Sequence, residues 1–181
     1  MDALLVLGLR ILIPLGILRY PLVFGLLAVF FDAVDVILMD AIQTDSLPVL
    51  TNFFHQNYHA LDKWLDTYYL GIAFLVSLKW KEVLAKRTSI VLFLWRLAGV
   101  IAFELTHLRA VLFFAPNLFE NFFFFYLIAR KIKPGWEIKT KKRLFIILGL
   151  LYIPKFFQEY LLHVMQAQPW NWLKSVLGLG K

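Results

Sequence analysis

The chain has 181 residues, of which 61% are hydrophobic and 17% aromatic, and its formal net charge is +7. Ordinary soluble domains are about 45–50% apolar, and a core of this size could not hide so many Phe, Leu and Ile side chains from water. The composition therefore excludes an ordinary soluble domain and indicates a chain whose apolar excess faces lipid or a large partner surface. Cysteine is absent, which excludes disulfides and thiolate metal sites.

The positive charge is arranged as in membrane proteins. Basic residues form short clusters between apolar runs, a pattern of membrane topology and not of nucleic-acid binding. We therefore expect the lipid bilayer, and no nucleic acid, as a partner. No cleavable signal peptide is predicted, because residue 2 is Asp and no A-x-A site follows the first apolar run. No low-complexity linker divides the chain, so residues 1–181 are predicted to form a single integral membrane domain.

The first apolar stretch is predicted to break before Pro21. As one helix, residues 3–42 would be roughly 60 Å long, about twice the thickness of the hydrocarbon layer of a bilayer. Proline disfavours a helical conformation at the residue before it, and Arg19 favours water. We expect an interfacial or re-entrant helix over 3–18, with a short extra span as the alternative, and a first confident span over 21–42.

Further apolar segments follow a loop that is predicted over 43–54. A helix is expected to start near residue 55, and the predicted spans cover 65–80, 89–107, 117–129 and 144–165. The Phe-rich run of the fourth span is expected to face lipid, or to line a site for a lipid tail, quinone or pigment. The tail over 168–181 has tryptophans beside lysines, which suits a helix at headgroup level. The predicted fold is all-α: a polytopic transmembrane helical bundle of about five spans plus N- and C-terminal interfacial helices.

Two Lys/Arg clusters predict the orientation of this bundle. They lie in the loops 79–87 and 130–143, and the positive-inside rule places both loops in the cytoplasm. All four histidines and nine of the twelve acids then fall in the non-cytoplasmic half. The rule does not require this second bias, because acids contribute little to it.

Ionisable side chains inside a bilayer are costly, so they are expected to face inward and find partners. Several predicted spans carry them into the same half, which predicts a shared polar cavity that binds and passes a cation or proton. The expected acceptors are Asp32, Asp35, Asp62, Asp66, Glu104 and Glu159. The expected supporting residues are Arg96, His107, Arg109, Glu120, Lys155 and His163.

The segment HQNYHALDKWLD contains a possible metal motif. It places His55, His59, Asp62 and Asp66 at i, i+4, i+7 and i+11, which is a narrow stripe if the segment is helical. Imidazole and carboxylate groups bind Zn, Mn or Fe, and oxygen-rich sites suit Mg or Ca. The alternative is a solvated helix start, where Asp and His are common. A divalent metal is the cofactor that this motif predicts.

Three functions remain open at this point. The first is the binding and passage of a cation or proton. The second is a divalent-metal-dependent enzyme acting on a lipid or polyprenyl-phosphate headgroup, in which the aspartates hold the metal and Arg96 or Arg109 meets the phosphate. The third is a non-catalytic subunit of a membrane complex, whose acids pair with Arg96, Arg109 or Lys155 and hold the helices together. In each case the short chain leads us to expect a homo-oligomer or another membrane subunit.

Overall fold

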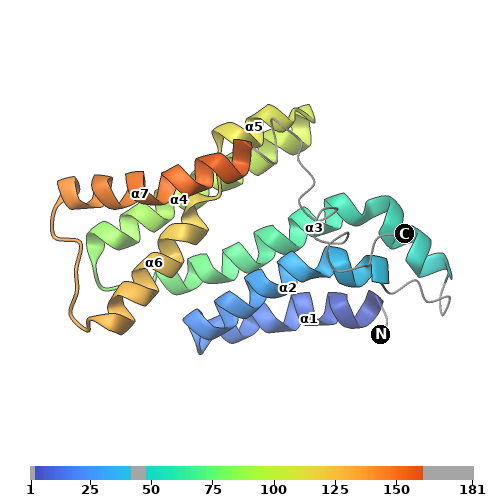
Figure 1. Ribbon diagram of the computed structural model, residues 1–181, viewed down its shortest axis with the longest axis horizontal. Coiled ribbons are helices and arrows are strands. Elements are labelled where there is room, and N and C mark those ends of the chain that lie inside the picture. Colours follow the sequence, from blue (N-terminus) through green and yellow to red (C-terminus); the bar gives the residue numbers. More distant parts are fainter. Residues whose placement is uncertain (1–2, 42–47, 161–181) are drawn as a thin grey trace. The chain divides into compact units, whose positions relative to one another are not determined.

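The computed structural model describes the backbone of residues 3–41 and 48–160, and the side chains of 7–33, 63–108, 110–158 and 160. Over the described backbone every regular element is a helix and no strand occurs (Figure 1). The protein is therefore all-helical in this part of the chain, as predicted. It divides into two compact units, the first ending at Ala73 and the second starting at Phe74.

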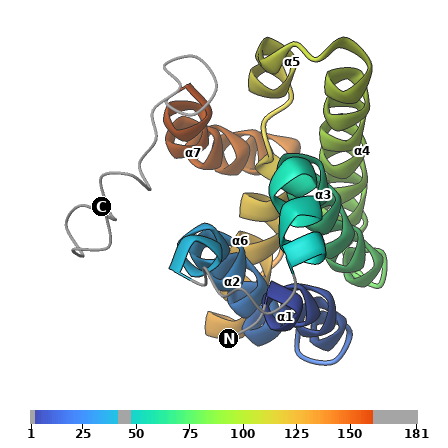
Figure 2. The same cartoon turned by 90° about the vertical axis from the view of Figure 1, so that its right-hand side faces the viewer.

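Unit 1 begins with a helical hairpin. Helix α1 (Ala3–Leu15) leads through the short 3-10 turn η1 (Gly16–Leu18) into α2 (Pro21–Ala41), and the two helices lie side by side (Figures 1 and 2). The predicted break before Pro21 is confirmed. Proline starts α2 because the first position of a helix makes no hydrogen bond through its N–H. The turn also needs glycine, since a Cβ on Gly16 would lie 2.2 Å from Cδ1 of Phe24.

Helix α3 (Pro48–Ser77) completes unit 1 and continues into unit 2. It is 30 residues long and starts well before residue 55, so the predicted loop over 43–54 is wrong in its second half. Pro48 lies in the predicted loop, but proline is tolerated in the first turn of a helix. A proline at this position is therefore compatible both with a loop and with the start of a helix.

Unit 2 contains four more helices, and three of them overlap predicted spans. They are α4 (Val83–Thr106), α5 (Arg109–Phe114), α6 (Leu118–Ile132) and α7 (Lys141–Glu159). The short helix α5 was not predicted. It lies between the predicted spans 89–107 and 117–129, where no helix was expected.

The core of unit 2 explains the Phe-rich run on α6. Phe119, Phe122 and Phe123 have at most 1% of their surface exposed, so these three rings are core and neither lipid-facing nor the lining of a site. The Trp80 ring stacks on Tyr126 with centroids 4.0 Å apart. The buried members of the core cluster are Ala85, Phe122, Tyr126, Ile138, Leu144 and Ile147.

Within the described part of the chain, two stretches are long and apolar enough to cross a membrane: Val83–Thr106 and Ala110–Ile132. Only 17% of the α4 stretch is buried, which is unlike the core helix of a soluble protein. Leu94, Trp95 and Ile101 are each more than half exposed on α4. Soluble monomers rarely expose large contiguous apolar patches, so these features fit a membrane location.

Candidate functional site

The clearest cluster of charged side chains lies in unit 1, around Arg10. One guanidinium nitrogen, Nη2, donates a hydrogen bond to the Asp32 carboxylate on α2 and a second, of 3.0 Å, to the Asp66 carboxylate on α3. The Arg10 side chain is only 6% exposed, whereas those of Asp32 and Asp66 are 35% and 33% exposed. A buried cation on α1 thus joins three helices, and both acids remain open to small ions. We call these three residues the Arg10 cluster.

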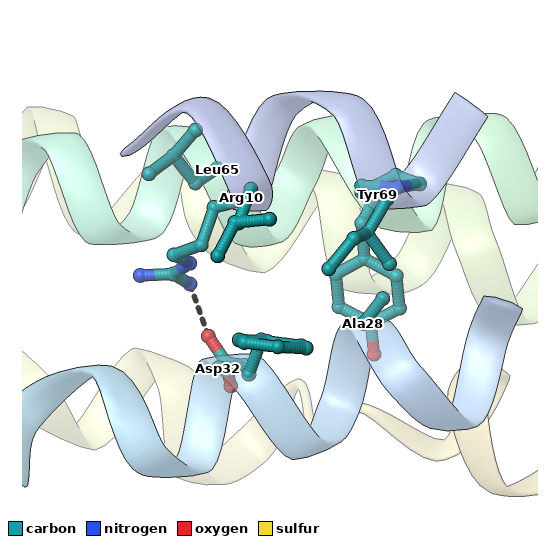
Figure 3. A pocket seen from close by; sticks show the side chains of 9 residues that line it. Arg10, Ala28, Asp32, Leu65 and Tyr69 are labelled. Carbon is teal, nitrogen blue, oxygen red and sulfur yellow. Dashed lines mark hydrogen bonds and ion pairs between the residues drawn. The ribbon is translucent and has the colours of Figure 1, made fainter. Parts of the chain in front are cut away.

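A small hollow lies beside the Arg10–Asp32 pair. It has room for about a single water molecule, and its lining residues are apolar apart from Arg10, Asp32 and Tyr69. Figure 3 shows Arg10 reaching toward Asp32, with the Tyr69 ring of α3 beside Ala28 of α2. Apolar walls reduce the local dielectric constant, so charges interact more strongly here than in water.

A second polar contact holds α1 against α3 close to the Arg10 cluster. The Tyr68 hydroxyl donates a hydrogen bond of 3.1 Å to the backbone carbonyl of Ile11. Pro14 lies inside α1, and because it lacks an N–H it cannot make the helical hydrogen bond to the Arg10 carbonyl. Side-chain donors from neighbouring helices commonly compensate for such prolines in membrane helices. The Tyr68 hydroxyl binds the next carbonyl along, that of Ile11, and so links α3 to α1 beside this missing hydrogen bond.

Two partly exposed carboxylates beside one guanidinium favour cations over anions. The Asp32 and Asp66 carboxylates accept from Arg10, and each side chain keeps about a third of its surface exposed. Carboxylate oxygens attract cations and repel anions, and the attraction is stronger beside apolar walls than in water.

The structure brings together two of the predicted acceptors, but with an unpredicted partner. Asp32 and Asp66 were expected to share a polar site, and they do so through Arg10. Sequence reasoning missed this arginine because it fell in a segment read as interfacial. A signal was present: Arg10 is a lone charge inside a long apolar run, and buried charges need a partner of opposite sign.

Of the three cations that were predicted to pair with the acids, Arg96 and Lys155 make described hydrogen bonds to uncharged groups, and the Arg109 side chain lies outside the described residues. Arg96 Nη1 donates to the Ala115 carbonyl at 3.0 Å, next to the bend between α5 and α6. Lys155 is buried, and its Nζ donates to the Gln158 side-chain oxygen at 3.1 Å. Carbonyls at the end of a helix need donors, so Arg96 stabilises the end of α5.

Glu120 also has a structural role at the start of α6. Asn117 accepts a hydrogen bond from the Glu120 N–H at 3.4 Å and donates one to its carboxylate at 2.9 Å, an arrangement that caps the helix. His107 ends α4 in the left-handed conformation, with φ of 55°. Glu104, in the last turn of α4, and His107 are both exposed at this helix end.

The metal motif falls largely outside the described side chains. The backbone of α3 is helical through it, as the motif requires, but only Asp66 has a described side chain. Among the side chains that are described, no group of three or more His, Asp or Glu residues could hold a metal ion. The predicted site residues that lie outside the described side chains are Asp35, His55, His59, Asp62, Arg109, Glu159 and His163.

The chain matches no protein-family model, no curated protein and no solved structure. The geometry of the Arg10 cluster and the composition of the chain are therefore the features that point to a function.

Proposed function

We propose that this chain is an integral membrane protein that binds and passes a cation or a proton. The observation that supports this most directly is the Arg10 cluster, in which one buried guanidinium serves two partly exposed carboxylates on different helices. Ionisable groups placed inside membrane helices are functional candidates because their insertion is costly. Asp32 and Asp66 are the proposed first acceptors.

The bonding of Arg10 suggests how an ion could enter and leave. Both carboxylates are held by the same nitrogen, Nη2, so an ion that takes one carboxylate leaves Arg10 with the other. The guanidinium is never stripped of all its acidic partners, and the cost of moving the ion is lower than that of breaking an isolated pair. Arg10 is thus a positioning residue, and the aspartates make the contact with the ion.

The wider membrane arrangement belongs to the same proposal. About five spans would cross the bilayer, with the loops 79–87 and 130–143 in the cytoplasm. The remaining acceptors would extend the ion path in the non-cytoplasmic half of the bilayer, supported by His107 and His163. A homo-oligomer or a second membrane subunit would complete it, because one short bundle has little room for a gated path. The remaining proposed acceptors are Asp35, Asp62, Glu104 and Glu159.

Flux through proteoliposomes tests this function. The purified protein is reconstituted, gradients of H⁺, Na⁺ and K⁺ are applied in turn, and ion entry is followed with ion-sensitive dyes. The wild type should carry at least one of these ions, and Asp32→Asn or Asp66→Asn should reduce its flux at least about tenfold. Glu137→Gln, which removes an exposed loop carboxylate, is the matched control and should behave as the wild type.

The two other functions are distinguishable in the same preparation. Metal-dependent cleavage or transfer of a lipid phosphate, with no ion flux, would favour the headgroup enzyme. Absence of flux and of turnover, together with a stoichiometric partner that co-purifies, would favour the non-catalytic subunit. Either result contradicts the proposal of ion passage.

A further inference from the structure

One end of unit 2 carries a concentrated positive charge. We call it the basic end and define it as residues 79–87 and 130–143, which contain eleven basic residues and two acids. Nine of the eleven basic side chains are exposed. The two loops are distant in sequence, but Figure 1 shows the start of α4, the end of α6 and the start of α7 at the same end of this unit.

A hydrogen bond joins the two loops of the basic end. Oε1 of Glu82 accepts from the backbone N–H of Ile138 at 2.6 Å, and Ile138 is buried. Nη1 of Arg130 donates to the Trp136 carbonyl at 3.2 Å within the second loop. Glu82 is turned toward the interior, so one of the two acids is removed from the surface that the lysines form.

Aromatic rings lie at the border between this charged surface and the apolar helices. Trp136 packs edge-to-face on Phe125 with centroids 5.6 Å apart, and the Arg143 guanidinium lies 4.8 Å from the Trp136 ring centre. Tryptophan at the polar end of apolar helices is typical of the headgroup region. The two candidate spans, Val83–Thr106 and Ala110–Ile132, respectively start and end here, so the lysines lie just beyond apolar helix ends.

The basic end also contains three cations at the N-terminus of α7, where the dipole of that helix is unfavourable for positive charge. Lys141, Lys142 and Arg143 form the first turn of α7, where no acid is present. A helix dipole is unfavourable for cations at the N-terminus, and Thr140 already caps this helix by accepting from the Arg143 N–H at 3.3 Å. The three cations therefore do not stabilise α7 through its dipole, and their side chains are exposed to an external anionic group.

We infer that the basic end binds the phosphate headgroups of anionic phospholipids in the leaflet that it faces. Clusters of Lys and Arg beside membrane helices attract anionic lipid, and here a hydrogen bond joins two such loops at the ends of apolar helices. The inference shares with the proposed function only the membrane location, and it does not depend on ion passage.

Spin-label electron paramagnetic resonance on the reconstituted full chain tests this inference. Spin-labelled phosphatidylglycerol should associate with the protein more strongly than spin-labelled phosphatidylcholine, and the preference should weaken as salt is added. The triple variant Lys139→Gln, Lys141→Gln, Lys142→Gln should lower the phosphatidylglycerol preference at least about twofold. The triple Arg variant at the same positions keeps the charge and should retain the preference.

The Gln variants should fold, because two of the substitutions remove cations from the N-terminal turn of α7. Helical content measured by circular dichroism checks this. Equal association of the two labelled lipids with the wild type, or an unchanged preference in a folded Gln variant, would overturn the inference. Preferential binding of an oligonucleotide with no lipid preference would also overturn it. Asp32→Asn separates the two proposals, since it should remove flux and leave the lipid preference intact.

Discussion

The guanidinium of Arg10 lies 3.0 Å from the carboxylate of Asp66, although 56 positions separate the two residues in the chain. This contact fixes the register of α1 against α3, and the neighbouring Tyr68–Ile11 hydrogen bond supports the same register. A charged contact at this depth is costly to form and costly to break singly. The Arg10–Asp66 pair is therefore a structural contact between two helices and not an incidental surface pair.

Removing the cation should destabilise unit 1 by leaving two carboxylates close together. We expect Arg10→Gln to lower the free energy of unfolding by about 1–3 kcal/mol, less than for fully buried pairs because both acids are about one-third exposed. Thermal unfolding in detergent, followed by tryptophan fluorescence, measures the loss.

A double variant provides the control for this effect. Arg10→Gln combined with Asp66→Asn should recover part of the lost stability, since it removes the repulsion between the acids. The coupling between the two positions should be at least about 0.5 kcal/mol. Strictly additive single effects would contradict an interaction between Arg10 and Asp66.

Close packing of α4 against the α5–α6 bend should make Gly99 intolerant of a side chain. A Cβ at this position would lie 2.2 Å from the Ala115 Cβ, an atom tied directly to the backbone. Gly99→Ala should cost about 1–3 kcal/mol of stability. Gly149→Ala in α7, where nothing lies within 4 Å of the added carbon, should be neutral or stabilising by up to about 1 kcal/mol. Equal unfolding midpoints for the two variants would contradict the packing described.

The hydrogen bond between Glu82 and Ile138 should protect the Ile138 amide from exchange. Hydrogen bonds to charged acceptors contribute about 1.5–3 kcal/mol, so Glu82→Ala should speed exchange of this amide about tenfold or more. Hydrogen–deuterium exchange with mass spectrometry measures the peptide that contains it. Glu82→Gln keeps an oxygen acceptor and should show a much smaller change; a similar increase in both variants would argue against the contact.

The helical class and several boundaries could be predicted because they depend on local chemistry. Apolar runs of span length have few alternatives to helix in a bilayer, and the break before Pro21 follows from the geometry of proline itself. The start of α3 was missed because Pro48 is compatible with both a loop and a first helical turn.

The contacts of the site were less predictable, because they depend on how helices pair. Nothing local connects Arg10 with Asp66, and the partners expected for the acids were cations in later spans. The buried face of α6 did leave a signal in the sequence. Phe119, Phe122 and Phe123 recur at i, i+3 and i+4, which is the periodicity of a core-facing helix stripe.

Charge movement on a solid-supported membrane tests the central claim most directly. A rapid change in the concentration of the transported ion, applied to adsorbed proteoliposomes, should give a transient current with the wild type and with Glu137→Gln. Asp32→Asn combined with Asp66→Asn should give no current above that of empty liposomes. A current of wild-type size from a folded double variant would contradict the claim that the Arg10 cluster carries the ion.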